Sequence, residues 1–312
     1  MKFSKPPLTF EDQLAKLRAR GLVIDDEVTA RWALRSLGYY RLAAYTLPFQ
    51  QNHLPDKPFR PDASLGAVLA LYTFDRELRL LVLDAVERIE VVLRTGLVYH
   101  LSHAHGAHWF MDANLFAPDF KHGEFIAQIE AEMALSPGEN RPFRQHAEVF
   151  INHYYRKYGD PRLPPSWMVA ETLSLGTISR LYAKLKCPKL RQTIAQAFGY
   201  NEAILGPWLH TLTYVRNLCA HHARLWNRQL VIKSQVPKRH ARDVPVGDRF
   251  YAVAFILADM LAAVESRSRW RLRLRELIEN HPEADQTAMG FPSGWTSHSL
   301  WRGDAPDLGG PI

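Results

Sequence analysis

The amino-acid sequence predicts an all-α protein, and three observations support this fold class. Apolar residues recur every three or four positions through most of the chain, which is the spacing of one helix face. Strand-like alternation of apolar and polar residues is nearly absent. One apolar pattern of helical period runs without a break from Ser64 to about His103, which predicts a single long helix.

Residues 1–50 are expected to form a small helical extension. Thr9 followed by Asp12 fits an N-cap pattern, and it predicts a first helix that Gly21 ends. A second helix is predicted over about 26–37, where another glycine stops it.

A tyrosine-rich segment and a polar loop follow that second helix. Tyr39, Tyr40 and Arg41 are adjacent, and aromatic rings beside an arginine can stack on nucleic-acid bases. Packing of the tyrosines against the main body is the favoured interpretation. Residues 51–63 are rich in Pro, Asp and Asn, so they mark the best candidate boundary, between an appended unit and the main domain.

The main helical domain is expected to span residues 64–281. It begins with the long helix, and the turn residues that follow divide the remaining sequence into shorter helices. These are predicted over 119–135 and 144–158, as two short helices on either side of 174–176, from about 188, and over 202–228 (with its exit), 248–265 and 268–280. Residues 282–312 are rich in Gly, Pro and Ser, and we expect a poorly ordered tail despite Trp295 and Trp301.

Charge and cysteine content limit the class of protein. The 312 residues carry a formal net charge of +7, which favours a polyanionic partner such as RNA or DNA, or an anionic membrane surface. Cys187 and Cys219 are too few for a disulfide framework, so a reducing cytoplasm is the simplest location.

Membrane insertion and several enzyme classes are not indicated. The N-terminus lacks an apolar signal-peptide core, and the most apolar segment, 251–264, is too short for a membrane span and contains Asp259. The chain has no P-loop, GxGxxG, HExxH or GxSxG pattern. We therefore expect neither a membrane anchor nor a cofactor.

Polar side chains gather along one face of the helix predicted in 202–228. His210, Tyr214, Asn217 and His221 follow helical spacing, and Arg216 lies beside them. The opposite stripe is apolar and is expected to face the core; it consists of Leu205, Trp208, Leu212, Val215 and Cys219.

Imidazole, amide and guanidinium groups at one helix end suit phosphodiester chemistry. His221 can exchange a proton near neutral pH, and Arg216 can clamp a phosphate with two donors. Asn217 lies one turn before His221 and can orient its ring. The two key residues are separated by roughly 140° on an ideal helix, so either Arg216 reaches round or the helix ends between them.

Other residues near this end have supporting or alternative interpretations. His222 falls at the edge of the apolar stripe, so we expect packing or support from it. Arg224 and Arg228 follow within two turns as candidate RNA contacts. Polar and cationic residues are also common at helix C-termini, where they complement the carbonyl groups, so spacing alone does not establish catalysis.

Two other polar clusters occur in the sequence. Arg267, Arg271 and Arg275 share one face at the last predicted helix, and they are either phosphate contacts or an ordinary solvated face. Histidines at 100, 103, 105 and 108 form a cluster without a nearby cysteine or acid pair, so no metal site is predicted.

Three sequence blocks resemble a known family. RNLCAHH, Arg216 to His222, is similar to the Arg-x4-6-His motif of HEPN-domain ribonucleases, and the longer RNLCAHHARLWNR resembles the AbiD/AbiF-type Abi-like abortive-infection proteins. The blocks PPLTFEDQLAKLRARGLVIDD, with LGYYRLAAYTLPF, and LPPSWMVAETLSLGTISRLY agree with that family. The resemblance extends from about residue 5 to about residue 280.

The resemblance implies a HEPN-like helical bundle that cleaves RNA without a metal, often as a homodimer. It implies that Arg216 binds the scissile phosphate, that His221 exchanges the proton, and that Asn217 orients one of these groups. A polar residue from another helix often faces such a site, and Glu90 is the candidate. The implied biological role is phage defence by abortive infection, or a toxin controlled by a protein or RNA antitoxin.

Two alternatives remain open. A non-catalytic RNA-binding or regulatory HEPN protein would explain the net charge equally well, and salt would weaken its binding steeply. A metal-dependent nuclease using the histidine cluster is the weakest hypothesis, and EDTA would abolish its activity.

Overall fold

Helices supply the regular structure of the chain. The computed structural model describes residues 2, 6–135, 142, 145–244, 246–265 and 267–302, and within these ranges it contains α-helices, short 3-10 turns and isolated bridges but no β-strand. The all-α prediction is confirmed. The α-helices are α1 (Phe10–Ala19), α2 (Glu27–Ser36), α3 (Tyr39–Thr46), α4 (Leu65–His105), α5 (His122–Glu132), α6 (Val149–Lys157), α7 (Ser166–Thr172), α8 (Leu175–Lys184), α9 (Pro188–Gln196), α10 (Glu202–Ala220), α11 (Phe250–Val264) and α12 (Trp270–Glu279).

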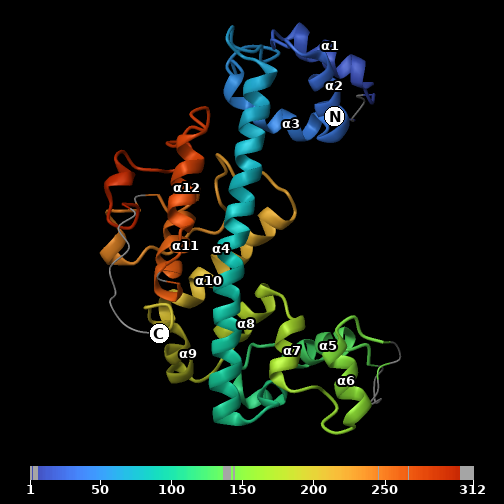
Figure 1. Ribbon diagram of the computed structural model, residues 1–312, viewed down its shortest axis with the longest axis vertical. Helices are drawn as coiled ribbons and strands as arrows, with labels where there is room; N and C mark the ends of the chain where they lie inside the picture. Colours follow the sequence, from blue (N-terminus) through green and yellow to red (C-terminus); the bar gives the residue numbers. More distant parts are fainter. Residues whose placement is uncertain are drawn as a thin grey trace.

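Helix α4 is the central axis of the molecule. Its 41 residues correspond to about 60 Å of helix, and α3, α7–α12 all pack against it. The Ser64 hydroxyl caps its first turn, and Gly106, with φ of +85°, ends it. Figure 1 shows α1–α3 at one end of α4, α5–α7 at the other, and α10–α12 along its side. The long helix predicted from the sequence is confirmed.

The N-terminal extension is attached at the start of α4. A reciprocal capping box between Thr9 and Asp12 opens α1, as predicted. The amide of Leu65 donates to the carbonyl of Val23 (2.9 Å), which ties the segment between α1 and α2 to the first residue of α4. Because this bond joins backbone atoms, its geometry does not depend on a flexible side chain.

The tyrosines of α3 have different environments. Tyr45 is 1% exposed and its ring meets that of Tyr72 edge to face, with centroids 5.3 Å apart. Tyr39 is half-buried, whereas Tyr40 is 94% exposed. Packing against the main body therefore accounts for Tyr45 and not for Tyr40.

Helix α11 is buried on nearly every side. Its residues from Phe250 to Ala258 are all buried, together with Met260 and Leu261. A helix that is apolar all round belongs in the interior of a protein, and α11 lies between α4, α10 and α12.

In the part of the chain that the structure describes, no helix combines the length and apolar character that crossing a membrane requires.

Residues 282–302 differ from the expectation of a poorly ordered tail. Trp301 is fully buried and its ring lies near that of Tyr251 on α11, while Trp295 is 6% exposed. The amide of Tyr251 donates to the carbonyl of Met289 (2.9 Å). Large aromatic side chains bury enough apolar area to order a Gly- and Pro-rich segment. Residues 303–312 lie outside the described residues.

The predicted helices of the middle segment exist but are shorter than expected. The helix predicted over 119–135 ends as α5 at Glu132, because Ala134 adopts a positive φ of 56°. The helix predicted over 144–158 is α6. The turn predicted between them falls mainly on residues outside the described ranges.

Candidate active site at the end of helix α10

Helix α10 has one buried face and one open face. The apolar residues predicted to face the core are all buried, and the Trp208 indole also donates to the carbonyl of Gln235 (2.6 Å). On the other face, His210 and Asn217 are exposed and Tyr214 is half-buried. The core therefore fixes the rotation of the helix and presents the polar stripe to solvent.

The helix ends between the two key residues of the motif. His221 is the C-cap, and His222 follows in the left-handed conformation with φ of 56°. The amide of His222 donates to the carbonyl of Cys219 (3.0 Å) and that of Ala223 donates to the carbonyl of Leu218 (2.9 Å), the two bonds of a Schellman motif. This termination releases His221 from strict helical geometry relative to Arg216.

The His222 side chain is exposed, so the expectation that it packs is wrong. Reversal of the chain at this residue turns its ring away from the apolar stripe. Its backbone carbonyl instead accepts a hydrogen bond from Arg41 Nη1 (2.6 Å). His222 therefore supports the site through its main chain, at the contact between α3 and the end of α10.

The three central side chains lie at the surface. Asn217 and His221 are exposed, and Arg216 is half-buried. Arg216 Nη1 donates to Asn217 Oδ1 (3.3 Å). Among the described residues, the Asn217 side chain therefore contacts the Arg216 guanidinium. It makes no hydrogen bond to the His221 ring, which is the contact expected from the sequence.

A buried ion pair that was not predicted from the sequence lies behind the motif. Asp75 is fully buried and pairs with Arg79, which is 4% exposed, one turn along α4. The Asp75 carboxylate also accepts from the Tyr45 hydroxyl (2.6 Å) and from the amides of Leu225 (3.1 Å) and Trp226 (2.6 Å). One carboxylate therefore joins α3, α4 and the segment that follows α10.

A signal for this pair exists in the sequence. Asp75 lies in helical register with Leu71, Leu78 and Val82, all of which are buried. A carboxylate on an apolar face is expected to find a cationic partner, because burying an unpaired charge is costly. Burial, reinforced by the Asp75 carboxylate, raises the pKa of Tyr45, so this hydroxyl stays a donor at neutral pH.

Arg224 and Arg228 act within the fold. Arg224 Nη1 donates to the carbonyl of Ala44 on α3 (3.4 Å), and burial lowers the pKa of Arg224. Arg228 Nη1 donates to the carbonyl of Arg224 (3.0 Å). Both side chains are part-buried, and their described contacts stabilise the segment after α10.

Glu90 is held by an ion pair on α4. Its carboxylate lies 2.7 Å from Arg94 Nη2, and the two side chains are 17% and 15% exposed. The same nitrogen of Arg94 donates to the carbonyl of Leu173 (3.1 Å) at the junction of α7 and α8. The described interaction of Glu90 thus supports helix packing, and its predicted role at the motif stays a prediction.

The arginines near α12 do not form a continuous free face. Arg271 Nη1 donates to the carbonyl of Leu300 (3.4 Å), and Arg275 pairs with Glu279 (2.6 Å). Arg267 is exposed but precedes the helix. The predicted phosphate-tracking face is therefore interrupted, because the packed tail and a carboxylate engage two of its three members.

The histidine cluster lies at the far end of α4. The Tyr99 ring stacks near His103, with centroids 4.3 Å apart, and His103 Nδ1 lies 2.9 Å from the Tyr99 carbonyl. Among the described residues, no group of three or more His, Cys, Asp or Glu side chains is arranged to hold a metal ion.

The two cysteines should react very differently with thiol reagents. Cys219 is 2% exposed and burial raises the pKa of its thiol to about 12, whereas Cys187 is exposed. Because the thiolate is the reactive form, we expect one thiol to react rapidly in native protein at pH 8 and two after denaturation. Titration with a chromogenic disulfide measures this. Rapid reaction of two thiols in native protein would show that the Cys219 face of α10 opens.

Comparison with known families gives one result. A family model described as "Abi-like protein" matches residues 32–227. The matched region includes α3, α4, all of α10, the motif at its end, and Trp226. No curated protein and no solved structure matches the chain significantly.

Proposed function

The chain belongs to the Abi-like protein family, and from this premise we propose that it is a metal-independent endoribonuclease of the HEPN type. The observation that carries the proposal is the solvent-exposed group of Arg216, Asn217 and His221 at the end of α10. The segment that follows this group is anchored at the amides of Leu225 and Trp226 by the buried carboxylate of Asp75. A rigid frame beneath exposed reactive groups is the arrangement that positions a catalytic site.

The proposed reaction uses the ribose itself as the nucleophile. The 2′-oxygen attacks the adjacent phosphorus and the bond from phosphorus to the 5′-oxygen breaks, which leaves a 2′,3′-cyclic phosphate and a 5′-hydroxyl. His221 exchanges a proton with the 2′-hydroxyl or the leaving oxygen, and Arg216 stabilises the charge that builds on the phosphate. Asn217 holds the guanidinium through the contact between their side chains. DNA lacks the nucleophile and is not cut.

The exposure of this group supports a site completed by a second copy of the chain. The Arg216 guanidinium contacts Asn217, and the His221 side chain is exposed to solvent. Groups from a partner copy would have room to face them. We propose a homodimer that acts in phage defence by abortive infection, or as a toxin restrained by a protein or RNA antitoxin.

The test is cleavage of a mixed RNA pool by the full-length protein with EDTA present. We expect products with 2′,3′-cyclic phosphate ends, detected by end-specific ligation and mass spectrometry, and no products from the matching DNA. Light scattering on the same sample should give twice the chain mass. Loss of cleavage in EDTA would contradict the metal-independent mechanism, and a monomer with full activity would contradict the shared site.

RNA that is bound but never cut would favour the second candidate, a non-catalytic RNA-binding protein. The observation on its side is that His221 has no side-chain partner among the described residues to activate it. The net charge of +7 is compatible with either function.

A further inference from the structure

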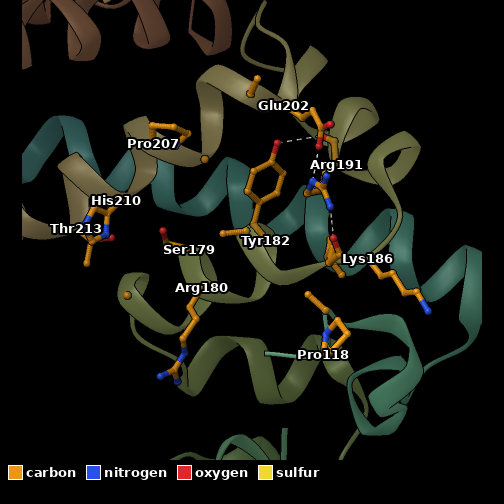
Figure 2. A pocket seen from close by; sticks show the side chains of 16 residues that line it. Pro118, Ser179, Arg180, Tyr182, Lys186, Arg191, Glu202, Pro207, His210 and Thr213 are labelled. Carbon is orange, nitrogen blue, oxygen red and sulfur yellow. Dashed lines mark hydrogen bonds and ion pairs between the residues drawn. The ribbon is translucent and has the colours of Figure 1, made fainter. Parts of the chain in front are cut away.

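An open groove of about 910 Å³ lies between α8 and α10. Figure 2 shows Ser179, Arg180 and Tyr182 of α8 on one side, and Pro207, His210 and Thr213 of α10 on the other. Its volume is within the usual range for ligand-binding clefts. The groove is separate from the Arg216–His221 group, because none of these three motif residues lines it.

Small residues keep the groove open although the two helices pack closely. Gly176 of α8 lies against Thr213, where an added Cβ would be 3.3 Å from the threonine methyl. Ala203, Gly206 and Pro207 of α10 occupy little of the space between the helices. Pro207 has no amide hydrogen, so the carbonyl of Ala203 loses its partner in the helix and remains an acceptor.

The rim of the groove is cationic. Arg180 and Lys186 are exposed, and the hydrogen bond that Arg180 makes among the described residues is a long one, 3.4 Å to the neutral amide of Gln128. The one carboxylate in the lining, Glu202, pairs with Arg191 and is neutralised by it. Two positive charges therefore remain without a described carboxylate partner, and they favour an anionic ligand.

The lining combines donors with apolar surface. His210 and Thr213 bring polar groups, and the exposed Pro118 adds apolar ring surface (Figure 2), whereas Ser179 and Tyr182 are buried. Phosphates attract cations and polar donors, while bases accept contact with apolar and aromatic surfaces. This mixture suits a single nucleic-acid strand better than a purely apolar ligand.

The face of α10 that borders the groove continues toward the motif. Ala203, His210 and Asn217 are seven residues apart, and seven residues turn an α-helix by nearly two full turns. They share a face, so Asn217 lies about 10 Å beyond His210 in the axial direction. His221 follows four residues later on the same stripe.

We propose that a segment of single-stranded RNA occupies this groove beside the cleavage site. Arg180 and Lys186 contact its phosphates, and the strand continues past His210 to Asn217 and His221. This inference rests on the proposed function, since it names the path of the substrate.

Binding of a fluorescent single-stranded RNA to the His221→Ala protein tests the groove without cleavage. In that background we expect Arg180→Ala with Lys186→Ala to raise the Kd at least tenfold. The slope of log K against log salt should fall by about 1.4, at about 0.7 per lost phosphate contact. Arg156→Ala with Lys157→Ala removes the same charge from exposed positions on α6 and should change neither value.

A steric variant supplies a second test without a change in charge. Ala203 is exposed in the groove, and Ala203→Trp should fill it and weaken RNA binding at least tenfold. Ala131→Trp on α5 is the matched control. Circular dichroism establishes that each variant is folded.

The outcomes separate the groove from the proposed function. Cleavage by wild-type protein together with unchanged binding in both groove variants would overturn the groove and leave the ribonuclease standing. Absence of RNA binding in the His221→Ala protein and of cleavage by wild type would overturn both. Weaker binding in Ala203→Trp with an unchanged salt slope in the charge variant would also overturn the inference, because it would show that Arg180 and Lys186 contact no phosphate of the RNA.

Discussion

Replacement of His221 with alanine should reduce RNA cleavage by about 10²–10⁴, the usual loss when a general acid or base is removed. Stability should be unchanged, because the ring is exposed and the C-cap bonds at this position use backbone atoms. Arg216→Ala should cost about 10²–10³, since it removes charge stabilisation from the phosphate. Initial rates on one fluorescent RNA, with unfolding curves for each protein, give both quantities.

The matched control for this experiment is His105→Ala. His105 is also exposed, but it lies thirty residues beyond Asp75 on α4, or about 45 Å along the helix. Its replacement should leave the cleavage rate unchanged. Full activity in a folded His221→Ala protein would show that this histidine exchanges no proton in the reaction.

Replacement of Asp75 with alanine should destabilise the protein by about 3–5 kcal/mol, the usual cost of removing one partner from a buried ion pair. The Arg79 guanidinium would stay in the core without a counter-charge. The amides of Leu225 and Trp226 would also lose their acceptor. Urea unfolding at neutral pH measures the change, and cleavage activity should fall with it because the segment after the motif loses its anchor.

Asp84→Ala is the matched control for Asp75→Ala. Asp84 also pairs with an arginine four residues later on α4, but its side chain is 30% exposed and that of Arg88 is 31% exposed. Its loss should therefore cost no more than about 1 kcal/mol. Equal destabilisation by the two variants would refute the special role of the buried pair.

A milder variant keeps this test usable if the Asp75→Ala protein does not fold. Tyr45→Phe removes one hydroxyl, which donates to the Asp75 carboxylate and accepts from Arg79 Nη1 (3.3 Å), and it leaves the ion pair itself in place. It should cost about 1.5–3 kcal/mol, the range for a hydrogen bond to a charged group. No loss of stability in this variant would show that the hydroxyl contributes nothing to the network.

Helix positions were largely predictable because their signals are local. The Thr9–Asp12 cap, the apolar period of α4 and the buried stripe of α10 depend on residues within a few turns of one another. Helix ends were less predictable. The sequence pattern of 119–135 does not show that Ala134 adopts a positive φ and stops α5 early.

The candidate site was predictable in its residues but not in its surroundings. The residue types and spacing of Arg216, Asn217 and His221 follow from the sequence, as does their exposed face. The contact of Asn217 with Arg216 and the left-handed turn at His222 depend on how the helix terminates. The hydrogen bond from Arg41 to the carbonyl of His222 stabilises that turn and joins residues 181 positions apart in the sequence.

The helical class of this protein, its family and the chemical groups of its motif follow from the order of its residues, because periodicity and motif spacing involve near neighbours. Which charges are available depends on the folded chain. Folding buries Asp75 with Arg79, engages two arginines near α12, packs residues 282–302 on α11 and leaves Arg180 and Lys186 beside an open groove. The physical reason is that charge pairing and burial depend on distances in space, and these bring together segments as far apart as Asp75 and Trp226.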